Sequence, residues 1–231
     1  DVRSSFAREF DADREFEEYE RMLDEVDLDV CVVAVPNSLH ADCAVAALER
    51  ETTVLVEKPL ADSLENAERI AAAEAESDAE VVVGFMKSFD AAVEAVDDAV
   101  AAGEFGDVYE VNVEYVRRRG VPQIGSWFTR KALSGGGAVV DIGPHMLHLA
   151  LKLLDFPELA GVSATAGSHF GSREDYTYLS MWGGEPTGDR TFDVEDHARA
   201  LVRTVDGPTI HLNVTWASNR EDVQHVQVLG D

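Results

Sequence analysis

Short apolar runs alternate with amphipathic segments through the first part of the chain. Three of the runs, at 30–35, 53–56 and 81–85, are continuous and rich in valine, which is typical of buried parallel strands. The segments between them carry apolar residues at helical spacing. The helices are expected over 5–25, from Asn37 or Ser38 to about Arg50, from Asp62 or Ser63 to about Glu76, and from about Asp90 to Ala102. This alternation predicts a parallel, doubly wound sheet.

The pattern changes after Gly106, where strand-like stretches follow one another with one helix among them, over 144–154. Strands without intervening helices predict a mostly antiparallel sheet. They are expected at 108–116, 161–166, 176–182, 196–205, 208–217 and 223–229, with an exposed loop at 183–191. The predicted fold class is therefore α/β plus α+β, with one domain over 1–105 and a second over 106–231.

Acidic residues outnumber basic ones by 45 to 19, so the formal net charge is −26. A field of that sign repels nucleic acid and anionic membranes, and no window is long and apolar enough to span a bilayer. The acidic residues are spread along the chain, and lysine is scarce. Such a surface is typical of a high-salt cytoplasm, so we expect a halophilic, haloarchaeal protein. An acidic enzyme of an ordinary cytoplasm is the alternative.

The two cysteines, Cys31 and Cys43, stand in apolar contexts without the spacing of metal ligands. They are expected to be reduced core residues of a cytoplasmic protein. No metal site is predicted.

One stretch carries candidate acid–base chemistry, with three glycines, Gly135 to Gly137, followed by Asp141 and His145. The glycines permit positive φ angles and the close approach of another backbone or a ligand. Residues four apart on a helix face one another, so the carboxylate would orient the imidazole and raise its basicity, as in a general base. The alternative is a helix-capping aspartate beside a surface histidine.

Two short motifs follow predicted strands, where open α/β sheets bind their ligands. Glu57-Lys58-Pro59 follows the strand at 53–56, and the scarcity of lysine favours a functional role over an exposed strand-end charge. Val-Pro-Asn-Ser-Leu-His at 35–40 stands where a dinucleotide would place its ribose or nicotinamide. Taken alone, this second motif is better interpreted as an ordinary turn between a strand and a helix.

Together these motifs resemble the Gfo/Idh/MocA family of NAD(P)-dependent oxidoreductases, which includes glucose–fructose oxidoreductase and inositol dehydrogenase. The resemblance rests on residues 35–40, 57–59, 84–86 and the Gly-Gly-Gly-x-x-x-Asp-x-Gly-x-His pattern at 135–145, and it extends to 194–198 and 215–217. It implies a Rossmann-type parallel domain followed by an open, mostly antiparallel sheet that carries the substrate and the oligomer contacts.

The resemblance also implies roles for individual residues. Lys58 matches the family's catalytic lysine, which hydrogen-bonds the reacting hydroxyl. His145 matches its proton-transfer histidine, and Asp141 its substrate-binding and orienting carboxylate. The nicotinamide half of the cofactor is expected against Pro36, Asn37, His40, Glu57, Lys58 and Trp127. His148 stands where many members carry aspartate and is expected to contact the substrate together with Asp141 and His145.

The family's glycine-rich G-x-G-x-x-G turn does not occur in this sequence. The first βα unit is therefore expected to be missing, with the chain incomplete at its N-terminus and ending inside a strand-like run. The residue that selects the cofactor is expected at or just before Asp1, so NAD and NADP both stay open.

The resulting hypothesis is a dehydrogenase that passes hydride from a secondary alcohol of a sugar, polyol or related compound to NAD or NADP. The predicted partners are a small-molecule substrate and further copies of the chain, in a dimer or tetramer formed through the antiparallel sheet. Two alternatives keep the fold without turnover: a sugar or nucleotide sensor, and a structural subunit of a larger oligomer. The intact set of Lys58, Asp141 and His145 favours the enzyme over the sensor.

Overall fold

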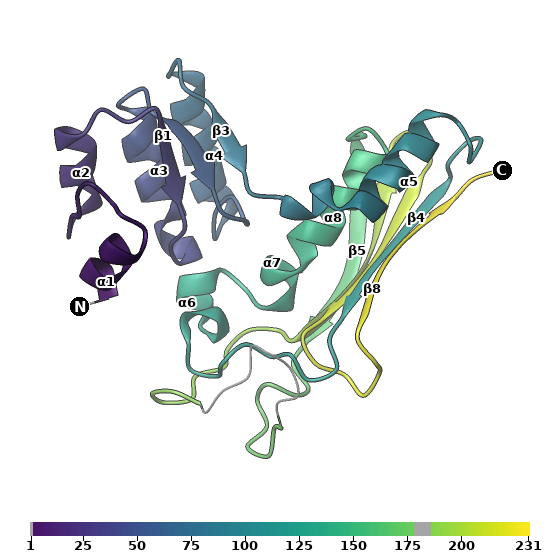
Figure 1. Cartoon of the computed structure of the whole chain (residues 1–231). Helices are drawn as coiled ribbons and strands as arrows, with labels where there is room; N and C mark the ends of the chain where they lie inside the picture. Colours follow the sequence, from purple (N-terminus) through teal and green to yellow (C-terminus); the bar gives the residue numbers. More distant parts are fainter. Residues whose placement is uncertain (1, 178–185) are drawn as a thin grey trace.

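Three short strands form a parallel sheet in the first part of the protein (Figure 1). In the computed structural model, which describes residues 2–177 and 186–231, they are β1 (Val30–Val33), β2 (Thr53–Val56) and β3 (Val81–Val83), in that order across the sheet. Helices α3 (His40–Leu48) and α4 (Leu64–Ala75) connect them. The predicted alternation of buried parallel strands and helices is confirmed.

The single helix expected over 5–25 is wrong, because two short helices, α1 (Val2–Glu9) and α2 (Tyr19–Glu25), replace it. Between them Asp11 adopts a positive φ of 53°, which a right-handed helix does not accommodate. Helix α1 buries no residue; Phe6 and Phe10 are exposed and contact each other, with ring centroids 4.5 Å apart. A helix without a core to cover gains little from tertiary packing, so nothing holds the segment in one long helix.

Side-chain caps decide where two of the other helices begin. Ser63 caps α4 by accepting a backbone N–H at 3.2 Å, as predicted, and Asp90 caps α5 (Ala91–Ala101) in the same way at 3.0 Å. The cap expected at Asn37 or Ser38 is wrong. Residues there form a separate 3-10 turn, η1 (Asn37–Leu39), and α3 begins after it without a side-chain cap.

A second, five-stranded sheet follows. Its strands are β4 (Glu110–Val116), β5 (Leu159–Gly167), β6 (His197–Thr204), β7 (Thr209–Thr215) and β8 (Val223–Leu229). The order is β5-β6-β7-β4-β8, and only the β4–β7 pair is parallel, so a mostly antiparallel sheet is confirmed. Of the strand expected at 176–182, residues 178–182 lie outside the described residues, and residues 186–191 of the expected loop contain no helix or strand.

Helices α5 and α8 (Gly143–Leu153) cover one face of the second sheet, and the other face is open (Figure 1). The side of α8 that packs into the core is apolar and consists of Met146, Leu149, Ala150 and Leu153. Val96 and Val100 of α5 pack against this second core, although the sequence assigns them to the segment 1–105. A separate core lies around the first sheet. None of the described helices is long and apolar enough to cross a membrane.

The open face of the second sheet is polar. Asn112 and Glu114 of β4 and His211 and Asn213 of β7 lie with Arg199 of β6 around a shallow hollow of about 580 Å³. Charged and amide side chains there keep the uncovered face compatible with water.

Candidate active site

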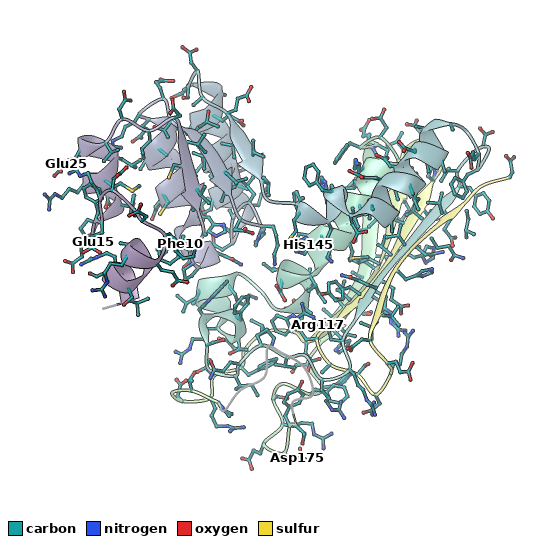
Figure 2. All side chains as sticks on the ribbon, viewed as in Figure 1. Phe10, Glu15, Glu25, Arg117, His145 and Asp175 are labelled. Carbon is teal, nitrogen blue, oxygen red and sulfur yellow. The ribbon has the colours of Figure 1, made fainter. Side chains whose placement is uncertain are left out.

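Described residues from both parts of the chain line one cavity of about 510 Å³. It lies beyond the carboxyl ends of β1, β2 and β4, because Ala34, Glu57 and Arg117 directly follow those strands. The first turn of α8 borders it through His145, which Figure 2 shows where that helix approaches the first part of the protein. Ligands bind at such strand ends in open α/β sheets. The cavity is therefore the candidate active site.

Lys58 leaves the end of β2 and reaches Asp141, which is 83 residues away in the sequence. Its Nζ donates to the main-chain O of Asp141 at 2.6 Å and to Oδ1 at 2.9 Å. The exposed fractions of the two side chains are 17% and 14%. An ammonium has three N–H donors, so one is left for a ligand in the cavity.

Asp141 has two further donors beside it. The indole Nε1 of the fully buried Trp216 donates to Oδ2 at 2.8 Å, and Nη1 of Arg117 lies 3.5 Å from the same oxygen. Burial alone would raise the pKa of Asp141, but the charges of Lys58 and Arg117 and the hydrogen bonds from Lys58 and Trp216 lower it below its ordinary value. The side chain is therefore a carboxylate near neutral pH.

No hydrogen bond joins the side chains of Asp141 and His145 among the described residues, although the charge of Asp141 acts to raise the pKa of His145, as expected. Asp141 is the last residue of α7 (Ala138–Asp141), and Ile142 separates that turn from α8 with a backbone φ of −108°. The four-residue spacing makes two side chains face each other only within one continuous helix. Asp141 directs its oxygens to Lys58 and Trp216 instead, and it is not a helix cap either.

His145 lies in the first turn of α8, next to Pro144, and lines the cavity. Its buried Nδ1 has no hydrogen-bond partner among the described residues. Burial and the positive charges of Lys58 and Lys87 lower the pKa of His145 from 6.5 to about 4. The imidazole is therefore neutral near pH 7 and has a lone pair available to accept a proton.

The three glycines position α7, and one of them, Gly136, also lines the cavity. A Cβ on Gly137 would lie 1.9 Å from the carbonyl O of Glu195, and one on Gly135, where φ is 82°, would lie 2.3 Å from the carbonyl O of Asp62. The Glu195 side chain accepts the backbone N–H groups of Gly137 and Val139, each at 2.9 Å. The close approach that glycine permits is thus to another backbone, which fixes the turn that carries Asp141.

The residues expected against the cofactor lie in or beside the cavity. Asn37, His40, Glu57 and Trp127 line it, and Pro36 does not. Asn37 uses its Nδ2 to donate to the carbonyl O of Ser134 at 2.8 Å, and the ring nitrogens of His40 lie 2.9 Å from the carbonyl oxygens of Val35 and Pro59. His40 therefore joins the turns after β1 and β2, whereas Asn37 joins the turn after β1 to α6 (Lys131–Ser134). The contact of either side chain with a cofactor stays a prediction.

His148 does not line the cavity. It lies one turn after His145, where its Nε2 is 3.0 Å from Ser88 Oγ and its ring stacks on Phe85 at a centroid distance of 4.1 Å. Because Ser88 and Phe85 hold the His148 ring outside the cavity lining, its contact with the substrate stays a prediction.

Sequence reasoning missed several residues of the site. Lys87 lies in η2 (Met86–Phe89), just after β3, and Tyr115 and Arg117 lie at the end of β4. The rule that singled out Lys58, a scarce lysine after a strand, applies equally to Lys87. Arg117 also follows a strand, but arginine is not scarce in this chain. Trp216 gives no such signal, because its indole meets Asp141 only through the fold.

Two family models match the chain. The first, described as the GFO/IDH/MocA C-terminal domain, covers residues 93–231. The second, described as an oxidoreductase family with an NAD-binding Rossmann fold, covers residues 2–85.

Curated relatives and solved structures agree with these matches. The chain is 33% identical over 208 residues to a putative UDP-kanosamine synthase oxidoreductase subunit of Amycolatopsis mediterranei, covering 88% of this chain and 56% of the relative. It is 30% identical over 212 residues to D-glucoside 3-dehydrogenase of Escherichia coli, covering 91% and 59%. The crystal structure of GenD2 from gentamicin A biosynthesis in complex with NAD superimposes with a TM-score of 0.79 at 29% identity, covering 98% and 59%. The chain thus spans less than two thirds of the length of each of these proteins.

Proposed function

The chain belongs to the Gfo/Idh/MocA family of oxidoreductases, and from that premise we propose that the protein oxidises a secondary alcohol of a sugar, polyol or related compound, with NAD or NADP as hydride acceptor. The observation that carries the proposal is the Lys58–Asp141 pair beside a neutral His145 in one cavity at the strand ends. One of the relatives, the D-glucoside 3-dehydrogenase of Escherichia coli, acts by its name on a sugar derivative, which supports this substrate class.

The cavity suits the nicotinamide half of the cofactor. Trp127 offers an aromatic surface, and Asn37 and Glu57 offer polar groups at the ends of two neighbouring parallel strands. The unpartnered Nδ1 of His145 indicates that a polar ligand is expected in the same space. When bound, the cofactor would supply the hydride acceptor.

The residues of the chain supply binding and proton transfer. Lys58, fixed by two hydrogen bonds to Asp141, donates its remaining N–H to the substrate hydroxyl and stabilises the developing alkoxide. The unprotonated ring nitrogen of His145 accepts the hydroxyl proton. Asp141, held as a carboxylate by Trp216 and Arg117, keeps the ammonium in place and balances its charge.

Three further features belong to the proposal. Residues 1–105 would mainly bind the cofactor and residues 106–231 the substrate. The polar open face around Arg199 and Asn213 would join copies of the chain into a dimer or tetramer. The charge of −26 fits a cytoplasmic protein of a salt-rich cell. Light scattering of Arg199→Glu tests the second point, because a repulsive charge on a shared face should shift the mass toward the monomer.

Turnover of a sugar and polyol panel with NAD and NADP tests the activity. We expect reduced cofactor to form, and His145→Ala to lower kcat by about 10²–10⁴ while cofactor affinity changes little. A sensor would instead bind sugars without reducing either cofactor. Full activity in His145→Ala would show that this residue is not the base.

A further inference from the structure

Two cations of the cavity, Lys87 and Arg117, lie beside the same aromatic ring, that of Tyr115. Lys87 Nζ lies 5.2 Å from the centroid of the Tyr115 ring, and the guanidinium carbon of Arg117 lies 5.0 Å from it. All three residues line the cavity that holds Lys58, Asp141 and His145. Arg117 is bound in place by main-chain and side-chain neighbours, since its Nη1 also lies 3.4 Å from Gly120 O. The negative face of an aromatic ring attracts cations, so the Tyr115 ring stabilises both charges.

The carboxylates of the cavity do not neutralise these cations. Lys58 occupies Oδ1 of Asp141, and Arg117 shares Oδ2 with the Trp216 indole at the longer distance of 3.5 Å. Glu57, the other acidic residue of the lining, is exposed and forms no ion pair with the described residues. The cavity therefore keeps a positive potential inside a chain whose net charge is −26.

Lys87 is unusual among the lysines of this acidic chain. Lys58 pairs with Asp141 and Lys152 with Asp97, at 2.9 and 2.7 Å, and Lys131 is exposed. Lys87 is half-buried, and the Tyr115 ring is the only interaction partner of its ammonium among the described residues. With 45 acidic residues available, a half-buried lysine without a carboxylate needs a separate reason.

The cofactor does not supply that reason. The nicotinamide ring of an oxidised cofactor is itself cationic, so it is repelled by an ammonium and a guanidinium. The pyrophosphate of a dinucleotide binds at the first βα turn of a Rossmann domain, whereas Lys87 follows β3 and Arg117 follows β4. The remaining occupant of the cavity is the substrate.

We propose that Lys87 and Arg117, which both contact the Tyr115 ring, form a subsite for an anionic group of the substrate, a carboxylate or a phosphate. The inference rests on the proposed function in naming a sugar, and it narrows the substrate class to sugar acids or sugar phosphates. A planar guanidinium and a point-charge ammonium together suit an oxyanion with several acceptor oxygens. An anion there would also offset the positive charges that depress the basicity of His145.

Equilibrium binding measured by calorimetry, at one fixed salt concentration and without turnover, tests the subsite. The ligands are D-glucose, D-glucuronate and D-glucose 6-phosphate, which share a ring and differ in charge. We expect at least one anionic ligand to bind about 10-fold or more tightly than glucose, as charge-assisted hydrogen bonds permit. Preference for glucuronate identifies a carboxylate substrate, and preference for the 6-phosphate identifies a phosphate.

Variants assign the effect to Lys87. Lys87→Gln should remove most of the preference for anions over glucose and leave glucose binding unchanged. Lys87→Arg should retain the preference for anions. The exposed control, Lys131→Gln, should change neither the anion preference nor glucose binding. Equal binding of glucose and both anions, or an anion preference that survives in Lys87→Gln, would overturn the inference. The outcome does not depend on catalysis: a protein that binds anions through Lys87 but reduces no cofactor contradicts the proposed function and leaves the subsite standing.

Discussion

The hydrogen bond from Trp216 to Asp141 joins the second sheet to the reacting centre, and removing it should measurably destabilise the protein. Trp216 is fully buried, and its Nε1 donates to Oδ2 at 2.8 Å. Trp216→Phe keeps an aromatic ring in the same place and deletes only the N–H and part of the volume. The carboxylate would then lose one of its donors inside a site that water reaches poorly.

The magnitude follows from these contacts. A hydrogen bond to a charged group contributes about 1.5–3 kcal/mol to the free energy of unfolding. The lost part of the indole adds a cavity cost of about 1 kcal/mol. Trp216→Phe should therefore lower the free energy of unfolding by about 3 kcal/mol. In a chain of this length that corresponds to a fall in Tm of about 6–12 °C.

A double-mutant cycle with Asp141→Ala separates the two contributions. Urea unfolding of the wild type, Trp216→Phe, Asp141→Ala and the double variant at fixed salt gives the coupling energy between the side chains. The cavity cost cancels in the cycle, so the coupling should equal the hydrogen-bond contribution of about 1.5–3 kcal/mol. Trp127→Phe is the matched control, because Trp127 stacks on Phe128 and its indole makes no hydrogen bond with the described residues.

A coupling energy below about 0.5 kcal/mol would refute the reasoning, because that is the scatter expected of independent sites. It would mean that the carboxylate does not depend on the indole.

Four further predictions concern activity and stability against pH, stability against salt, and the glycine turn. Burial and the charges of Lys58 and Lys87 lower the pKa of His145 to about 4, so kcat/KM should begin to fall on the acidic side only near pH 4. A fall near the ordinary pKa of 6.5 would contradict the proposed role of His145. In the same range the unfolded imidazole binds a proton that the folded one does not, so urea unfolding should show stability decreasing as the pH falls from 6.5 toward 4. The net charge of −26 predicts a melting midpoint that rises from dilute buffer to molar KCl, and a flat or falling midpoint excludes salt adaptation. Gly137→Ala should abolish or strongly weaken folding because its Cβ meets the Glu195 carbonyl at 1.9 Å, whereas Gly103→Ala, with φ of 74° and nothing within 4 Å, should cost only about 1 kcal/mol in the same unfolding assay.

The parallel sheet could be predicted from the sequence because strands buried on both faces leave continuous apolar runs, as at 30–35 and 53–56. The prediction of one helix over 5–25 was wrong because apolar spacing alone does not show whether a core exists for the helix to cover. The parallel pairing of β4 with β7 could not be predicted from the sequence either, because strand order depends on contacts between residues far apart in the chain.

Part of the candidate site could likewise be predicted from the sequence, and part could not. Lys58, Asp141 and His145 could be found from motifs that end at strands or helices, and all three line one cavity. The prediction that Asp141 faces His145 assumed one continuous helix, whereas Ile142 separates two helices. Trp216 could not be predicted, because it reaches Asp141 across 75 residues through the register of β7.

The most direct test of the account is the initial rate of cofactor reduction by Lys58→Met, compared with the wild type on a substrate found in the sugar panel. Lys152→Met is the matched control, because Lys152 also forms an ion pair, with Asp97, outside the cavity. The account predicts that Lys58→Met stays folded and loses about 10²–10⁴ in kcat, while Lys152→Met keeps the wild-type rate. A folded Lys58→Met that reduces the cofactor at the wild-type rate would contradict the account.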